Sequence, residues 1–468
     1  VTQMPELGAR AGVRPMTQRD LQTREIEATS QSDTSEDTAP QPRPPVKRRP
    51  GAAGAIVALL VVVALGVALF ASLSLHRTPQ GAARVSATGV ATSGVPTAAP
   101  FLPTPSPTLA VSPVQTPTRG TGLPAGVQVI TFVMMGTDEG WATGGANMDP
   151  VSGMPQSGMV LHYAAGSWSQ VGAALPSAYL GGLDMISSSE GWAMGGDGSN
   201  QSLLLHISNG GWQQVSLPND PQAAPAVLAM RTPDEGWMAM ANLKTAYSGA
   251  NTSLFHYAAG AWSLVSTPLH YITDVAPIAD GEAWVIGWNT DGTGSLVRVQ
   301  GGTATVVLSS PSNSSFSRLR VFAPNDIWIE GAKHAAANAE VYDEPLAYHF
   351  DGSAWVRVNL RVPQGVQHVG IVSSTTAWSF ASIQPMPPNQ TAYGQIASIY
   401  SNAGGQWQTL SVPYKDLQSL EVVSQSSTDV WAIGVYMVTM QTSANTSSSV
   451  SEYVLLHYTG GTWTEYGR

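Results

Sequence analysis

Short hydrophobic runs separated by turn residues fill the chain from residue 125 to 468. Residues 180–218 show the repeating unit, in which the apolar run LGGLDMIS, the turn SSEG and the run WAMGG are followed by SLLLHIS, the turn NGG and WQQVSLP. Apolar runs of this length between Gly, Asp and Ser turns indicate β-strands. Each unit therefore predicts four strands.

Tryptophan marks this unit at a regular interval. A first Trp recurs every 44 to 53 residues, at Trp141, Trp192, Trp237, Trp284, Trp328, Trp378 and Trp431. A second Trp follows in most units, at Trp168, Trp212, Trp262, Trp355, Trp407 and Trp463. A repeat of this length is typical of a β-propeller. We predict an all-β, seven-bladed propeller of four-stranded blades over residues 125–468, with these Trp side chains filling the wedges between blades.

The first and last units are both complete. No exchange of a strand between the two ends of the repeat region is therefore evident from the sequence. We expect ring closure to rest on packing between units one and seven.

A different pattern precedes the repeats. Residues 1–50 are polar and predict a disordered tail. Residues 51–75 carry no charged side chain and are long enough, at roughly 1.5 Å per residue, to cross a bilayer as one transmembrane helix. Residues 76–124 are rich in Pro, Ser and Thr and predict an extended stalk.

The basic residues flanking the apolar run predict its orientation. Arg43, Lys47, Arg48 and Arg49 lie just before residues 51–75, so the positive-inside rule places the N-terminus in the cytoplasm. We therefore expect a single-pass protein of the plasma membrane, with the propeller outside the cytoplasm. The absence of Cys and the high Ala and Gly content favour a bacterial surface protein.

The net charge of the propeller restricts the classes of partner that it can bind. The net charge of −10 divides into +4 over residues 1–123 and −14 over residues 124–468. An acidic domain repels the phosphate backbone, so nucleic acid is excluded as a partner. The absence of Cys also excludes a thiol nucleophile and a thiolate metal site.

Two propeller families resemble the repeated unit. The paired glycines, the His162-Tyr163 pair and the later Trp168 followed by Leu-Pro resemble kelch repeats. The DEGWA, LHY and GGTW segments are similar to repeats of photosystem II assembly factor-like and Asp-box propellers, with Asp351 nearest to the Asp-box acid. The resemblance covers about residues 125–468 and implies a propeller, whereas a fold of this kind does not imply one function.

Two sets of polar residues recur in the repeats. Five histidines share a position on the third strand, which is too far from the axis for them to meet at one ion: His162, His206, His256, His349 and His457. Acids precede the first Trp, where they are expected to cap the first turn: Asp138, Glu139, Glu190, Asp234, Glu235, Glu282, Asp326 and Asp429. We interpret both sets as structural, and predict no catalytic residue, metal or cofactor.

Long connections between the second and third strands predict the ligand-binding face, because variable loops on a rigid scaffold commonly carry binding residues. The longest include 146–157, 241–252, 332–345, 383–395 and 435–452. The aromatic and acidic candidates there are Trp288, Tyr247, Tyr342, Asp343, Glu344 and Tyr393. Trp288 stands outside the Trp repeat, and either fills the volume lost at Ala304 or offers an aromatic platform to a sugar or peptide.

These observations predict a membrane-anchored binding or protein-interaction scaffold without catalysis, whose ligand is a protein or a glycan. One alternative is a glycan-processing enzyme of the sialidase or lyase type, which needs arginines that converge on a carboxylate. Arg231, Arg318 and Arg320 fall on first strands, which face the channel, and are the candidates. A second alternative, an assembly factor for a membrane complex, rests on the resemblance alone.

Overall fold

The computed structural model describes residues 112–148, 155–197, 201–218, 223–242, 251–334, 343–363, 366–382, 396–403, 406–414, 417–424, 428–443 and 446–467. The predicted tail and transmembrane segment, residues 1–75, and most of the predicted stalk lie outside these ranges. Within them, no helix has the length and apolarity needed to cross a bilayer.

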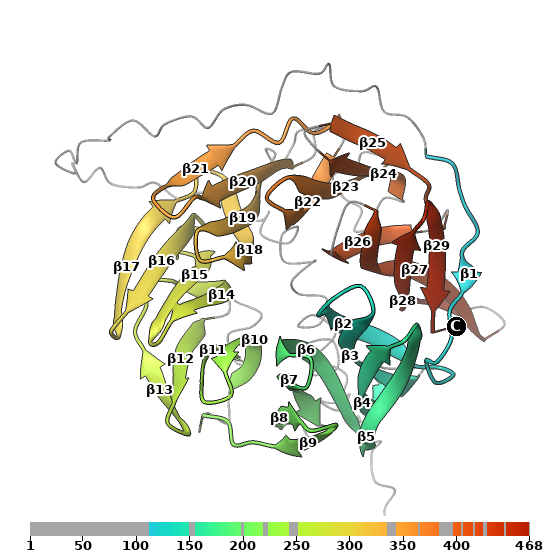
Figure 1. Cartoon of the computed structure of the whole chain (residues 1–468), viewed down its shortest axis with the longest axis horizontal. Helices are drawn as coiled ribbons and strands as arrows, with labels where there is room; N and C mark the ends of the chain where they lie inside the picture. Colours follow the sequence, from blue (N-terminus) through green and yellow to red (C-terminus); the bar gives the residue numbers. More distant parts are fainter. Residues whose placement is uncertain are drawn as a thin grey trace, which may run out of the picture. The chain divides into compact units, whose positions relative to one another are not determined.

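Seven antiparallel sheets follow one another around a central axis and form the predicted seven-bladed propeller (Figure 1). Blade one is β2 (Gln128–Met134), β3 (Glu139–Met148), β4 (Pro155–Ala164) and β5 (Ser167–Pro176). Blade two is β6 (Ala178–Ser187), β7 (Glu190–Asp197), β8 (Ser202–Ser208) and β9 (Gly211–Gln214). Blade three is β10 (Ala223–Thr232), β11 (Glu235–Asn242), β12 (Thr252–Ala258) and β13 (Ala261–Val265).

The remaining blades repeat this order. Blade four is β14 (Tyr271–Ala279), β15 (Glu282–Trp288), β16 (Gly294–Gln300) and β17 (Thr303–Ser309). Blade five is β18 (Ser314–Ala323), β19 (Asp326–Lys333), β20 (Glu344–Phe350) and β21 (Trp355–Val358). Blade six is β22 (Val366–Ser373), β23 (Thr376–Ser382), β24 (Ile396–Ala403) and β25 (Gln406–Leu410). Blade seven is β26 (Leu417–Ser424), β27 (Asp429–Ser443), β28 (Thr446–Thr459) and β29 (Thr462–Tyr466).

The recurrent glycine three residues after the first Trp has a steric cause. Each inner strand has a register shift near its start, as between Leu180 and Gly182 in blade two. At this irregularity the Tyr179 carbonyl oxygen would lie 1.9 Å from a Cβ on Gly195. Gly287 of blade four faces the Tyr271 carbonyl oxygen in the same way, at 2.0 Å. In these two blades a Cβ at this position would collide with the inner strand, whereas blades three and six have Met240 and Ala381 there.

The first Trp of every repeat packs at the interface with the next blade, as the sequence predicts. All seven side chains are at most 5% exposed: Trp141, Trp192, Trp237, Trp284, Trp328, Trp378 and Trp431. Each belongs to a buried cluster that joins its own blade to the following one. The second Trp is more variable, because Trp168 and Trp463 are buried whereas Trp212 and Trp407 are only partly so. These Trp side chains therefore form the wedges between blades.

Ring closure combines the predicted packing with an additional strand. Blades one and seven share a buried cluster that includes Phe132 and Trp431. In addition, β1 (Thr118–Arg119) pairs in parallel with β29 on the outer edge of blade seven, so that sheet has five strands (Figure 1).

The segment that carries β1 runs along the outer edge of three blades, and we call residues 112–122 the strap. Val114 bridges to Val412 after blade six, and Thr121 bridges to Ser167 of blade one. The end of the predicted stalk is therefore part of the propeller. The strap could not be predicted from the sequence, because most of its partners lie about 300 residues away. One example is the Ser112 hydroxyl, which accepts from the Ile399 amide at 3.3 Å.

One predicted loop is a β-ladder. The second connection of blade seven was expected to run over 435–452, but β27 and β28 remain paired through Ser443 and Thr446. The Ser- and Thr-rich sequence of this stretch suits a strand as well as a loop, because Thr and Val are both common in strands.

Candidate functional site

A bonded set of three side chains recurs in the blades and accounts for the repeated histidines and acids. In blade two, the Glu190 carboxylate lies 2.7 Å from His206 Nε2, and the His206 ring stacks on Trp192 with centroids 4.5 Å apart. The same acid, His and Trp positions are paired in blades one, three, five and seven. The structural interpretation of the histidines agrees with this arrangement. The acids at the start of the second strand bind these histidines rather than only closing the turn.

Blades four and six depart from this set. In blade four, Arg298 replaces the histidine, pairs with Glu282 and lies 5.7 Å over the Trp284 ring. In blade six, Thr376 stands at the acid position and Ser401 stands opposite Trp378, where the other blades have histidine. Blade six therefore has neither charge of the pair.

Two aspartates on inner strands connect neighbouring blades. The Met230 amide of blade three donates to Asp184, and the Leu319 amide of blade five donates to Asp274 at 2.8 Å. Protein surrounds both carboxylates on most sides. This desolvation, together with the negative charge of Asp274, raises the pKa of Asp184 to about 6 despite the Met230 amide. Desolvation likewise raises the pKa of Asp274, against the opposing effects of the Leu319 amide and Arg318.

Two of the three candidate arginines, Arg231 and Arg320, bind different carboxylates. Arg231 forms ion pairs with Glu235 and Asp280. Arg320 donates to Glu330 at 3.2 Å and to the main-chain carbonyl of Val422 in blade seven at 3.3 Å. Separate carboxylates thus neutralise two of the three arginines. Arg231 and Arg320 therefore do not converge on one carboxylate, as sialidase chemistry would require.

The predicted ligand-binding residues are only partly described. Tyr247, Tyr342 and Tyr393 lie outside the described residues. Glu344 forms an exposed ion pair with Lys333, with their closest atoms 3.3 Å apart. Asp343 lies 2.8 Å from His334 Nδ1.

Trp288 is partly buried and packs against Tyr271, with ring centroids 5.5 Å apart. It pairs with Gly294 at the start of β16, whereas Ala304 pairs with Val299 near the end of that strand. The two residues therefore lie toward opposite ends of the blade. The prediction that Trp288 fills the volume lost at Ala304 is wrong.

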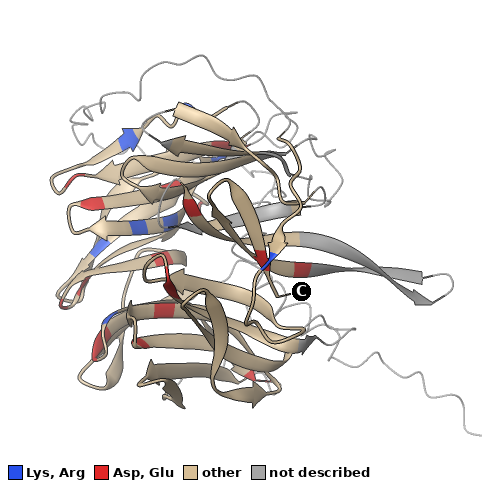
Figure 2. Ribbon diagram, turned by 45° about the vertical axis from the view of Figure 1, so that its right-hand side comes forward, with Lys and Arg blue, Asp and Glu red and all other residues tan. Residues whose placement is uncertain are grey.

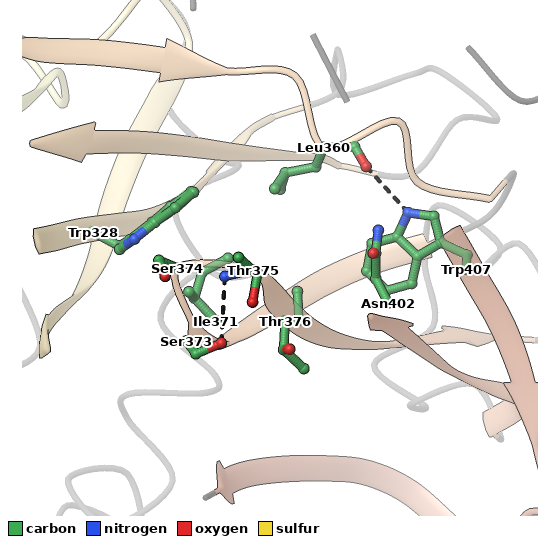
Figure 3. A pocket seen from close by; sticks show the side chains of 10 residues that line it. Trp328, Leu360, Ile371, Ser373, Ser374, Thr375, Thr376, Asn402 and Trp407 are labelled. Carbon is green, nitrogen blue, oxygen red and sulfur yellow. Dashed lines mark hydrogen bonds between the residues drawn. The ribbon is translucent and has the colours of Figure 1, made fainter. Parts of the chain in front are cut away.

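A hollow opens between blades five and six, at the first turn of blade six. About 280 Å³ of empty space lies there, and part of it is open solvent. Figure 3 shows Trp328 and Trp407 on either side of this turn. The remaining lining residues are mainly hydroxyl-bearing or apolar: Leu360, Ile371, Ser373, Ser374, Thr375, Thr376, Ala377 and Asn402. None of the lining side chains is charged.

The bonding of Trp328 differs from that of its counterpart in blade one. The Trp141 indole N–H donates to the Ser188 carbonyl, on the first turn of the next blade, at 2.9 Å. The Trp328 indole N–H instead donates to Asp326 of its own blade at 3.0 Å. Asp326 also accepts from His349, so the same carboxylate binds the Trp328 indole and the His349 imidazole. The hollow lies beside the first turn of blade six, to which the Trp328 indole does not donate.

Trp407 forms the opposite wall of the hollow. Its indole N–H donates to the Leu360 carbonyl at 3.1 Å, which fixes the ring across the interface between blades (Figure 3). Ser374 and Thr375 are exposed, and the Thr375 amide donates to the Ser373 hydroxyl at 3.3 Å. Sequence reasoning missed this site because all of these residues occupy ordinary repeat positions. The one available signal was the loss of the acid and the histidine in blade six.

Charged residues are scattered over the ribbon rather than gathered in one place (Figure 2). In the described ranges, no three His, Asp or Glu side chains come together in a group that could hold a metal ion.

Comparison with known proteins gives a likeness of fold. No protein-family model and no curated protein matches the chain. Among solved structures, YCF48 bound to D1 peptide is 13% identical over 76% of this chain and 99% of that one, with a TM-score of 0.40. YCF48 from Cyanidioschyzon merolae is 13% identical over 73% of this chain and 98% of that one, with a TM-score of 0.43. SapL1 lectin in complex with alpha methyl fucoside is 11% identical over 62% of this chain and 96% of that one, with a TM-score of 0.37. No functional argument rests on likenesses of this size.

Proposed function

We propose that this chain is a membrane-anchored binding propeller that takes a neutral glycan in the hollow between blades five and six. The observation that carries the proposal is the pairing of two indoles with hydroxyl and carboxamide groups around an uncharged space. Ligand sites commonly combine aromatic walls with a few polar groups that fix orientation.

The chemistry of the hollow suits a sugar ring. Its apolar C–H face can pack against Trp407, while its hydroxyls exchange hydrogen bonds with exposed Ser374 and Thr375. The hollow is open to solvent and has only about 10 Å³ clear of protein atoms, room for about one water molecule, so a sugar ring would rest at its mouth against Trp407. A charged sugar would have no ionic partner among the lining residues.

Membrane attachment is part of the proposal. Residues 51–75 supply the anchor, and the basic residues before them keep the N-terminus in the cytoplasm. Residues 76–111 then span from the bilayer to the strap. The hollow would face ligands outside the cell.

A glycan array probed with the full-length protein in detergent tests the proposal. Neutral glycans should bind, and Thr375→Val should weaken binding at least severalfold because it removes one exposed hydroxyl with little change in volume. Trp407→Ala should remove most of the binding. Absence of binding to every neutral glycan would contradict the proposal, as would binding that Trp407→Ala leaves intact.

Trp355→Ala is the matched control. Trp355 occupies the same repeat position in blade five and is also partly buried, but it does not line the hollow. It should therefore alter stability without altering glycan binding. An equal loss of glycan binding in the Trp407→Ala and Trp355→Ala variants would show that the effect comes from general packing and not from the hollow.

A further inference from the structure

Three side chains at the far end of blade five from the hollow form a continuous hydrogen-bonded series. His334 Nδ1 lies 2.8 Å from the Asp343 carboxylate, and His334 Nε2 lies 2.9 Å from the Ser315 hydroxyl oxygen. Because a carboxylate only accepts, the neutral imidazole must donate from Nδ1. Its Nε2 is then the acceptor for the Ser315 hydroxyl proton. This is the order of contacts that activates a serine nucleophile.

His334 is bonded differently from the five repeated histidines. Each of those presents Nε2 to a carboxylate and packs against a Trp ring, as His349 does with Asp326 and Trp328. His334 presents Nδ1 to its carboxylate and leaves Nε2 to a serine. The scaffold role that explains the repeated histidines therefore does not explain this one.

The three groups lie on or directly beside strands of blade five. Ser315 lies on the inner strand β18, His334 directly follows β19, and Asp343 directly precedes β20. Asn313 binds both main-chain groups of His334. The His334 amide donates to the Asn313 carbonyl at 2.8 Å, and the Asn313 side-chain amide donates to the His334 carbonyl. Asn313 adopts a left-handed backbone with φ of 58°. Asn tolerates this conformation better than most residues, and here it shapes the turn that leads into β18.

We propose that Ser315, His334 and Asp343 form an acyl-transfer site that cleaves esters of short, unbranched acyl groups. Ser315 Oγ attacks the ester carbonyl as His334 Nε2 takes its proton, and Asp343 stabilises the imidazolium. The C–O bond to the leaving alcohol then breaks, and His334 returns the proton to that alcohol. Water attacks the acyl-serine in a second cycle through His334, which releases the carboxylic acid and restores the Ser315 hydroxyl.

Exposure sets the substrate class. Ser315 is 6% exposed, so a bulky or branched acyl group cannot bring its carbonyl to Oγ. The side chains of His334 and Asp343 are 23% and 32% exposed, which leaves the leaving alcohol on the solvent side. The nearby Lys333 and Glu344 neutralise one another and add no preference for a charged ester.

Covalent labelling of the full-length protein in detergent tests the site without relying on turnover. Ser315 Oγ should attack the phosphorus of a fluorophosphonate and displace fluoride into solution, and peptide mass mapping should find the phosphonate on that residue in the unaltered protein. His334→Gln should slow labelling at least tenfold, and Asp343→Asn should slow it less. With p-nitrophenyl acetate, an acetyl group should appear on Ser315.

Two variants separate the site from background reactivity. Ser317→Ala removes an exposed serine of the same strand, and His349→Gln removes a histidine of the same blade. Neither should change labelling of Ser315. The proposal is overturned if the unaltered, folded protein carries no adduct at Ser315, or if His334→Gln labels at the unaltered rate. The labelling of Ser315 in the unaltered protein needs no substitution, so the proposal can be overturned even if a variant fails to fold.

Discussion

The His457 ring lies parallel to the Trp431 indole, with centroids 4.1 Å apart and an interplanar angle of 9°. His457 Nε2 is also 2.8 Å from the Asp429 carboxylate. On the blade one side of the interface, the rings of Phe132 and Tyr163 pack against the same indole. One histidine thus orients the Trp that joins the last blade to the first.

Replacing this histidine should destabilise the ring. His457→Ala removes the stacked pair and leaves Asp429, whose side chain is 22% exposed, without this partner. The loss should be about 2–4 kcal/mol in the free energy of unfolding, measured by chemical denaturation. His162→Ala is the comparison, because its bond to Glu139 is 3.3 Å long and that side chain is 42% exposed. A loss at His162 equal to that at His457 would contradict the account.

The strap should contribute to closure through Gly120. A Cβ there would lie 2.2 Å from the Tyr466 ring, while the Gly120 amide donates to the Glu465 carbonyl at 2.7 Å. Gly120→Val should therefore displace the strap, cost about 1–3 kcal/mol, and speed hydrogen exchange of β29 amides. Gly136→Ala, where nothing lies within 4 Å of the added Cβ, should change neither quantity. Unaltered exchange in β29 of the Gly120→Val variant would argue that the strap does not close the ring.

Asp184 should make stability depend on pH. Its folded pKa is raised from 3.8 to about 6, so between these values the folded chain keeps a proton that the unfolded chain releases. Its contribution therefore favours folding at pH 4 and is lost as pH rises through 6, by up to about 3 kcal/mol. Urea denaturation at pH 4.5 and 7.5 should show that Asp184→Asn loses less stability over this interval than the unaltered protein. Equal pH dependence in both proteins would disprove this role.

Arg320 should be needed to neutralise a buried acid. Glu330 is 8% exposed and also accepts from the Ile371 amide of blade six at 2.7 Å. Arg320→Met would leave this carboxylate without its cation, at a cost of about 3 kcal/mol in the free energy of unfolding. Lys333→Met breaks the exposed pair with Glu344 in the same blade and should cost below about 1 kcal/mol. Thermal or chemical unfolding that ranks these two variants in the reverse order would refute the assignment.

The fold was predictable because its cause is local and repeated. The interval between Trp residues, the turn residues and the apolar runs all act within one blade, and blades one to seven lie where those patterns place them. The strap and the ladder of β27 and β28 were not predictable in this way. The strap pairs with strands hundreds of residues away, and the ladder has a Ser/Thr-rich sequence that fits a loop equally well.

The sites were harder to predict because they depend on which repeat positions meet across blades. Asp343 was proposed as a ligand-binding residue from its loop, yet its partners His334 and Ser315 follow from the pairing of β18 with β19. Trp328 and Trp407 share the spacing of the other Trp residues, so the sequence alone does not distinguish a wall of a hollow from a wedge. Only the interface geometry separates these roles.

The most direct test of the glycan-binding claim follows the indole N–H resonances of the full-length protein during titration with neutral monosaccharides. Trp to Phe substitutions assign the signals of Trp328, Trp407 and Trp355. The account predicts saturable shifts for Trp328 and Trp407, and none for Trp355, which lies outside the hollow. Unchanged signals for Trp328 and Trp407 at every saccharide concentration, or equal shifts in all three, would contradict it.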